Sequence, residues 1–143
     1  MRMAAVAAIS LGLTVAAGPA RAADGATGTW RLSSGKVTVR VSPCGGGLCG
    51  RVVALRKPRD DKGRPRLDKE NPNPALRSRP VIGLTILSNM RAKGEGMWSG
   101  IIYNPDDGNT YSSSMQLLGP STMKVNGCVV GVFCKSMKFI RVD

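Results

Sequence analysis

Residues 36–42 read Lys-Val-Thr-Val-Arg-Val-Ser and alternate strictly between polar and apolar side chains. Successive side chains of a β-strand point to opposite faces, so Val37, Val39 and Val41 are expected to share one face of a sheet. Residues 50–55 (GRVVAL) follow a turn that contains three consecutive glycines. Glycine supplies the backbone conformations that a tight reversal needs, so the two segments predict a β-hairpin with one buried face.

The same period of two continues to the end of the chain, with turn residues about every eight to twelve positions. Further strands are expected at residues 81–87, 97–103, 110–117, 122–126 and 135–142. Only residues 74–78 and 88–93 could form a turn or two of helix. The sequence therefore predicts an all-β fold, a small up-and-down antiparallel β-barrel of about seven to eight strands, because closure leaves no free strand edge.

The first 22 residues have the composition of a secretory signal peptide. Residues 1–3 (MRM) provide a positive start, and residues 4–17 form an apolar run that Gly18-Pro19 ends before the about 20 residues of a transmembrane helix. Ala20-Arg21-Ala22 has small residues at the positions that signal peptidase reads, which predicts cleavage after Ala22. The alternative is an apolar helix at the start of the domain. The expected product, residues 23–143, is a single periplasmic or secreted domain without a transmembrane segment.

Removal of residues 1–22 leaves 19 basic and nine acidic side chains, and such a surface favours anionic partners. Export argues against nucleic acid and leaves the anionic lipids and glycans of the envelope. Residues 56–79 hold nine of the basic residues and four prolines, which predicts a long basic loop. The alternative is a solvated loop whose charge serves only solubility. The candidates for a basic surface are Arg56, Lys57, Arg59, Arg64, Arg66, Arg77 and Arg79.

Four cysteines form two close pairs in the sequence, Cys44 with Cys49 and Cys128 with Cys134. An oxidising compartment favours disulfides. Four cysteines allow three connectivities, and we prefer the two local bridges because each pair flanks a turn that contains glycine. A zinc site with four thiolates is the alternative, but its spacings would be looser than those of typical structural zinc sites, and export argues against it.

The chain contains no histidine, the usual general base of nucleophile systems and the commonest metal ligand. Asp106 and Asp107 could be paired carboxylates, but residues 104–108 (NPDDG) are first a hairpin turn. We therefore expect a protein that is not an enzyme and that has no catalytic residue, cofactor or metal site.

Gly28-Thr29-Trp30 resembles the G-x-W motif of the first lipocalin strand, and Arg141 stands on the last predicted strand, where lipocalins place an arginine across that tryptophan. A closed barrel brings its first and last strands together, so the guanidinium can pack on the indole face. This resemblance implies a lipocalin-like (calycin-like) barrel closed by Gly28, Trp30 and Arg141. The alternative is a tryptophan that only fills the core.

A longer set of motifs is more specific. It comprises Cys44-Gly45, Leu48-Cys49-Gly50-Arg51-Val52, Asn71-Pro72, Leu76-Arg77, Arg79-Pro80, Gly83-Leu84, Trp98, Gly100, Ile102-Tyr103, Pro105, Asp107-Gly108, Thr110-Tyr111 and Gly127. With these motifs the chain resembles the bacterial exported domain-of-unknown-function family numbered 2147, from about Gly28 to Arg141. Asn104 replaces a common aspartate, Phe139 replaces a usual tryptophan at the closing end of the barrel, and the second cysteine pair is an addition.

The resemblance implies a barrel cavity for a small apolar or amphipathic molecule. Residues that could line this cavity are Trp98, Ile102, Tyr111, Met115 and Met123. The leading hypothesis is a non-catalytic periplasmic carrier or sensor, although a barrel of this size can instead be filled by its own side chains. The second hypothesis is an envelope factor whose basic loop binds anionic lipid or glycan. A third, an enzyme that uses carboxylate or tyrosine chemistry, needs no histidine.

Overall fold

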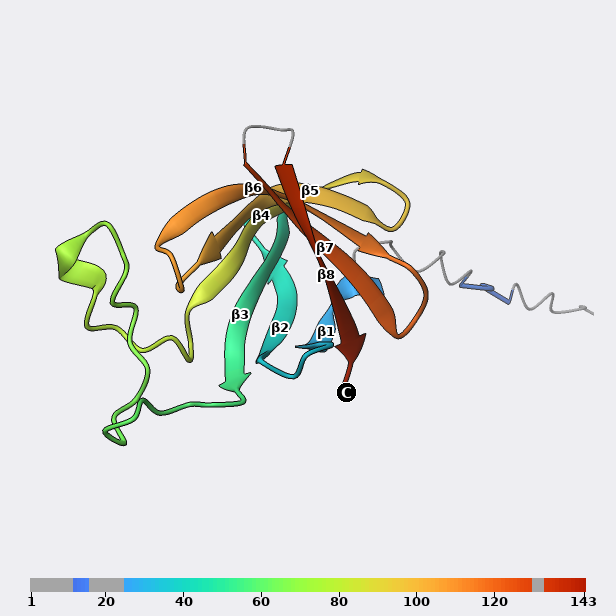
Figure 1. The fold of residues 1–143 in the computed structure, drawn as a ribbon. Coiled ribbons are helices and arrows are strands. Elements are labelled where there is room, and N and C mark those ends of the chain that lie inside the picture. Colours follow the sequence, from blue (N-terminus) through green and yellow to red (C-terminus); the bar gives the residue numbers. More distant parts are fainter. Residues whose placement is uncertain (1–11, 16–24, 130–132) are drawn as a thin grey trace, which may run out of the picture.

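The computed structural model describes residues 12–15, 25–129 and 133–143, and this part of the chain contains eight β-strands. The strands are β1 (Gly28–Leu32), β2 (Val37–Cys44), β3 (Gly47–Leu55), β4 (Thr85–Gly94), β5 (Met97–Asn104), β6 (Asn109–Leu117), β7 (Thr122–Val129) and β8 (Phe133–Arg141). Each strand pairs antiparallel with the next and β8 pairs with β1, so the sheet closes into a barrel (Figure 1). The prediction of an all-β, up-and-down antiparallel barrel is confirmed.

The barrel begins at Gly28, shortly after the predicted cleavage site. That site at Ala22 and most of the predicted signal peptide lie outside the described residues. Within the described ranges, no helix is long and apolar enough to cross a bilayer.

Apolar side chains fill the barrel interior because they alternate with polar ones along the strands. On β2, Val39 and Val41 are each 1% exposed, whereas Arg40 between them is exposed. The buried apolar side chains form one cluster, whose burial provides the main driving force for folding. It contains Ala26, Trp30, Val39, Val41, Leu48, Val52, Val81, Leu84, Ile86, Leu87, Met90, Trp98, Ile102, Met115, Met123, Val125 and Phe139.

Strand β4 begins and ends later than the predicted strand at 81–87. Residues 88–93, which could have formed a turn of helix, are instead the second half of β4. The pairing of β4 with β5 shifts register between Ser88 and Arg91, and Asn89 has a φ of 53°. A β-bulge of this kind interrupts the period of two, which hid the strand in the sequence.

The segment between β3 and β4, residues 56–84, stands off at one side of the barrel (Figure 1). Its short helix is a single 3₁₀ turn, η1 (Pro74–Leu76), within the predicted helical stretch 74–78. The Asn73 side chain caps this turn by accepting a hydrogen bond from the backbone N–H of Ala75 at 3.1 Å. Isolated bridges pair Arg59 with Pro65 and Leu67 with Pro80, so this loop has defined local structure.

The four cysteines, all within the described residues, form two disulfides. Cys44–Cys49 joins β2 to β3 beside their connecting turn. Cys128–Cys134 joins β7 to β8, where the two residues lie directly opposite each other. The structure thus has the two local bridges that we preferred among the three connectivities.

Candidate functional site

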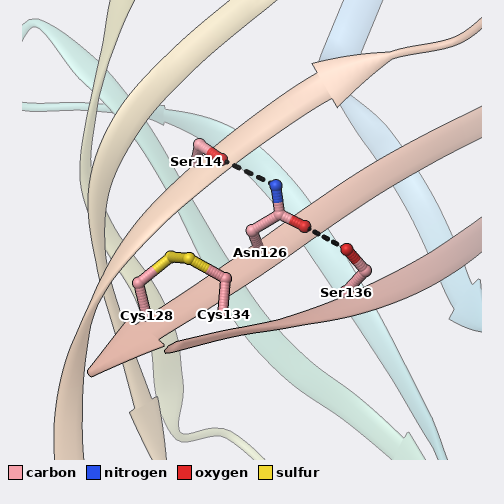
Figure 2. The surroundings of a disulfide bond; sticks show 5 residues. All are labelled: Ser114, Asn126, Cys128, Cys134 and Ser136. Atoms are coloured by element: carbon pink, nitrogen blue, oxygen red, sulfur yellow. Dashed lines mark hydrogen bonds between the residues drawn. A yellow bond between two sulfur atoms is a disulfide. The ribbon is translucent and has the colours of Figure 1, made fainter. Parts of the chain in front are cut away.

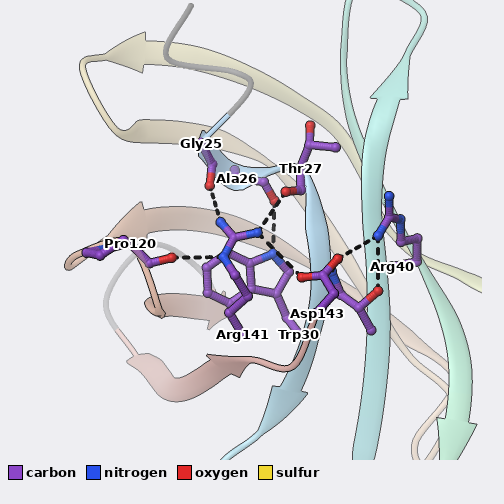
Figure 3. A network of polar contacts seen from close by, with 9 residues as sticks. Gly25, Ala26, Thr27, Trp30, Arg40, Pro120, Arg141 and Asp143 are labelled. Carbon is purple, nitrogen blue, oxygen red and sulfur yellow. Dashed lines mark hydrogen bonds and ion pairs between the residues drawn. The ribbon is translucent and has the colours of Figure 1, made fainter. Parts of the chain in front are cut away.

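One end of the barrel is closed by Trp30 and Arg141. Trp30 is 0% exposed, and its indole N–H donates to the carbonyl oxygen of Ala26 at 2.9 Å. The guanidinium carbon of Arg141 lies 4.3 Å from the centroid of the Trp30 ring, which is close enough for a cation–π interaction (Figure 3). Because β8 pairs with β1, the first and last strands carry this contact.

The Arg141 guanidinium also donates to three backbone carbonyls near this end. Its Nε donates to Pro120 at 2.8 Å, and its two Nη atoms donate to Thr27 at 2.9 Å and to Gly25 at 2.5 Å (Figure 3). Gly28 has a φ of 149°, and a Cβ at this position would lie 2.2 Å from Nη1 of Arg141. The absence of a side chain at Gly28 therefore leaves the space that the Arg141 guanidinium occupies over the Trp30 ring.

The residues that we predicted for a cavity are brought together inside the barrel. Trp98, Ile102, Met115 and Met123 are at most 8% exposed and belong to the core cluster, and Tyr111 is half-buried against it. In the strand register Trp98 faces Met115, and Ile102 faces Tyr111. These side chains therefore form one packed wall of the barrel. They also contact the other buried apolar side chains of the core cluster.

Ser113 is a polar residue inside this apolar wall, between Tyr111 and Met115 on the inward face of β6. It is 5% exposed, and its Oγ has no hydrogen-bond partner among the described residues. Its register neighbours are Gly100 on β5 and Gly127 on β7, so three small residues form a row across three strands. A buried hydroxyl without a hydrogen-bond partner lowers the free energy of unfolding by about 1–3 kcal/mol. Among the described residues, Ser113 alone has such a buried side-chain group.

Sequence reasoning did not select Ser113, although the alternation along residues 110–117 already placed it on the inward face. The signal was a serine at a position where both inward neighbours on the strand are large and apolar or aromatic.

Two hollows open to solvent lie outside this row. One, of about 480 Å³, lies where β6 begins and β7 ends, and Tyr111 and Cys128 are among its lining residues. The other, of about 350 Å³, lies where the long loop enters β4, and Arg79 and Ile82 help to line it. Of the predicted cavity residues, Tyr111 alone lines either of these two hollows, at the rim of the barrel.

The long loop is anchored by a buried carboxylate. Asp68 is 0% exposed and accepts hydrogen bonds from the Tyr103 hydroxyl at 2.5 Å and from Asn71 Nδ2 and Arg79 Nε, each at 2.9 Å. Burial raises the pKa of the Asp68 carboxyl, but these three hydrogen bonds outweigh burial and hold the pKa below its usual value. Burial and the Asp68 carboxylate raise the pKa of Tyr103. The network therefore keeps an ionised carboxylate and a neutral phenol in contact.

Most arginines that we proposed as a basic surface bind the loop itself. Arg79 contacts Asp68, and Arg64 Nε donates to Asp60 at 3.0 Å. The other arginines donate hydrogen bonds to backbone carbonyl oxygens. The acceptor is Ser34 for Arg56, Gly63 for Arg59, Lys57 for Arg66 and Asn71 for Arg77. These contacts give the arginines a structural role, while all of the proposed residues except Arg79 stay exposed to solvent.

The turn between β5 and β6 has the local hydrogen bonds that its sequence suggested. Asn104 Oδ1 accepts from the backbone N–H of Asp106 at 3.0 Å, and Asp107 Oδ1 accepts from that of Asn109 at 2.8 Å. Asp107 also accepts from the Tyr111 hydroxyl. A Cβ on Gly108, whose φ is 74°, would lie 1.8 Å from the carbonyl oxygen of Glu70, so the turn packs closely on the long loop.

Comparison with known proteins agrees with this architecture. No curated protein matches the chain. A solved structure described as "Protein HP1028 from the human pathogen Helicobacter pylori belongs to the lipocalin family" is similar, with a TM-score of 0.70 and 22% sequence identity over 82% of each chain. The model of the family described as "Uncharacterized protein conserved in bacteria (DUF2147)" matches residues 28–141, from the first to the last strand of the barrel. The chain therefore belongs to the bacterial DUF2147 family and has the fold of a lipocalin.

Proposed function

We propose that this protein is a non-catalytic binding protein of the bacterial envelope, which holds one small apolar or amphipathic ligand inside its barrel. The observation that carries the proposal is the buried Ser113 hydroxyl, which has no partner among the described residues and stands in an otherwise apolar wall. A polar group of an amphipathic ligand would satisfy this hydroxyl. The apolar part of the ligand would contact Ile102, Tyr111 and the methionines.

The composition of the wall supports this proposal. Met90, Met115 and Met123 are each 1% exposed, and Met137 packs against the same cluster. Methionine has three rotatable side-chain bonds, so a methionine-rich wall can repack around a guest at little cost. A Cβ on Gly100 would lie 2.5 Å from the carbonyl oxygen of Asn89, so the backbone of β4 covers that end of the row, and we place the polar group of the ligand at Ser113. Trp30 and Arg141 close one end, so the ligand enters from the other.

Export is part of the proposal. The apolar run at residues 4–17 and the small residues before Ala23 support a signal peptide, and the two disulfides are compatible with an oxidising compartment. Sequencing the amino terminus of the protein from periplasmic extract tests this step. A chain that begins at Ala23 supports export, and an intact Met1 in the cytoplasm would contradict it.

Binding of the apolar fluorescent probe N-phenyl-1-naphthylamine tests the interior site. Ser113→Leu fills the row of small residues and is expected to abolish the rise in probe fluorescence. Ser112→Leu, an exposed position on the same strand, is the matched control and should leave probe binding unchanged. If Ser113→Leu does not fold, Met115→Trp provides a second way to fill the same wall. Equal probe binding by the wild type and a folded filled variant would refute an interior site.

A further inference from the structure

Lys135 is a charged residue on the inward face of β8. The direction of its side chain follows from the alternation along the strand. The next residue, Ser136, belongs to a polar chain on the outward face: Ser136 Oγ donates to Asn126 Oδ1 at 2.6 Å, and Asn126 Nδ2 donates to Ser114 Oγ at 3.2 Å (Figure 2). Successive side chains of a strand point to opposite faces, so Lys135 lies on the interior side of the sheet.

The buried residues of β8 agree with this assignment. Phe139 is 3% exposed and Met137 packs against the core cluster, and both alternate in step with Lys135. Lys135 continues this inward series toward the end of the barrel that is remote from Arg141. On the described strands β5 to β8, Lys135 and Arg141 are the only charged residues that the register places on the inward face. Arg141 stacks on Trp30, which leaves Lys135 as the cation at the other end.

Lys135 extends the row of small residues that contains Ser113. Its register partner is Gly127, which is in turn opposite Ser113. A Cβ on Gly127 would lie 3.3 Å from Cγ2 of Ile102, so the face that these partners share is the one that the core covers. Neighbouring strands lie about 4.8 Å apart, so about 10 Å separates the Cα atoms of Ser113 and Lys135. The flexible four-carbon stem of the lysine spans much of this distance.

The ammonium of Lys135 has no ion-pair partner among the described residues. The turn between β5 and β6 lies at the same end of the barrel, but its carboxylates already have partners. Asp106 contacts Lys36. Asp107 accepts from the Tyr111 hydroxyl. The row therefore offers an unpaired cation at the exposed rim and an unpaired hydroxyl in the buried wall, and both can donate hydrogen bonds to one anionic group.

We propose that the ligand of the barrel is a single-chain amphiphile whose polar end is a carboxylate. This inference rests on the proposed interior site and names the chemistry of its polar end. Lys135 Nζ and the Ser113 hydroxyl donate to the carboxylate, and the apolar chain contacts Met115 and Met123. One ammonium balances one negative charge, so a neutral, a cationic or a doubly negative head group fits this pair less well.

Displacement of N-phenyl-1-naphthylamine by amphiphiles with the same alkyl chain tests this chemistry. Dodecanoate should displace the probe at a concentration about tenfold lower than dodecanol does, the factor expected from one hydrogen bond between charged groups. Dodecyltrimethylammonium should be the weakest competitor. Lys135→Gln should remove the preference for dodecanoate. Lys138→Gln is the matched control, because it loses the same charge from an exposed outward position on the same strand, and it should keep the preference.

Lys135→Arg keeps the positive charge and should also keep the preference for dodecanoate. Probe binding that Ser113→Leu abolishes, together with equal displacement by dodecanoate and dodecanol, would overturn this inference and leave the interior site in place. An equal loss of preference in Lys135→Gln and Lys138→Gln would assign the preference to the overall positive charge and would also overturn it. If the wild type binds neither the probe nor any of these amphiphiles, the proposed interior site fails, and this inference fails with it.

Discussion

Tyr103 on β5 donates its hydroxyl hydrogen to Asp68 at 2.5 Å, and this contact ties the segment between β3 and β4 to the barrel. The two residues are 35 positions apart in the sequence. Asp68 is fully buried and accepts from Asn71 and Arg79 as well, so one carboxylate organises both halves of the loop. The loop is therefore held by tertiary contacts, although its composition is that of a solvated segment.

Tyr103→Phe removes one donor to Asp68 and leaves a buried carboxylate oxygen without that partner. We expect the free energy of unfolding to fall by about 1–3 kcal/mol, as is usual when a buried charged acceptor loses a hydrogen bond. Urea denaturation measures this change. Tyr111→Phe, which removes the more exposed contact with Asp107, is the control and should have a smaller effect. Equal losses of unfolding free energy in the two variants would show that the buried Asp68 network stabilises the fold no more than the exposed contact does.

The pKa of Asp68 in the folded protein lies below its ordinary value of 3.8. A lowered pKa stabilises the fold when the pH is above the ordinary value, and this stabilisation is lost as the pH falls through the lowered value. The wild type should therefore lose stability in acid below about pH 4. Asp68→Asn should be less stable at neutral pH and should show a shallower loss in acid. An identical pH slope for the two proteins, measured by urea denaturation, would contradict this role of Asp68.

Gly28→Ala tests the closed end of the barrel. Its Cβ would lie 2.2 Å from Nη1 of Arg141, in a backbone conformation that side chains rarely adopt. We expect a loss of more than about 1 kcal/mol of stability, together with a change in Trp30 fluorescence as the guanidinium moves. Gly119→Ala is the control, because a Cβ there meets nothing within 4 Å. A thermal denaturation curve of Gly28→Ala that matches the control would argue against the closure.

Ser113→Ala tests whether the buried hydroxyl lowers the stability of the protein without ligand. In the empty protein the substitution removes an unpaired polar group, so we expect the stability to rise by about 1 kcal/mol. A loss of stability on urea denaturation would instead show that the hydroxyl contributes to the fold. Ser114→Ala removes the hydroxyl that accepts from Asn126 and should destabilise the protein, which makes it a suitable comparison.

The sequence predicts the parts of this fold that follow from local alternation. Val39 and Val41 are buried as the pattern at residues 36–42 indicated, because a hairpin between two alternating strands needs no distant information. β4 was partly missed because the bulge at Asn89 interrupts the period. The loop was recognised from its prolines and charges. Its anchoring was not, since Asp68 meets Tyr103 only after the barrel has closed.

The candidate site, like the fold, could be predicted only in part from the sequence. Trp30 and Arg141 could be paired from the sequence through the resemblance to lipocalins, which place an arginine of the last strand across this tryptophan of the first strand. The inward positions on β5, β6 and β7 were also recognised, but composition does not tell whether a serine at such a position finds a partner. Ser113 stands out only when its neighbours Gly100 and Gly127 are known from the strand register.

Native mass spectrometry of the wild type and of Ser113→Ala, each purified gently from periplasmic extract, tests the ligand-binding proposal most directly. We predict that the wild type carries one reproducible additional mass, which organic solvent extracts as a small apolar or amphipathic molecule, and that Ser113→Ala retains less of it. If both proteins have only the mass of the chain with its two disulfides, and neither binds the apolar probe, the barrel interior is a packed core and the ligand-binding proposal is wrong.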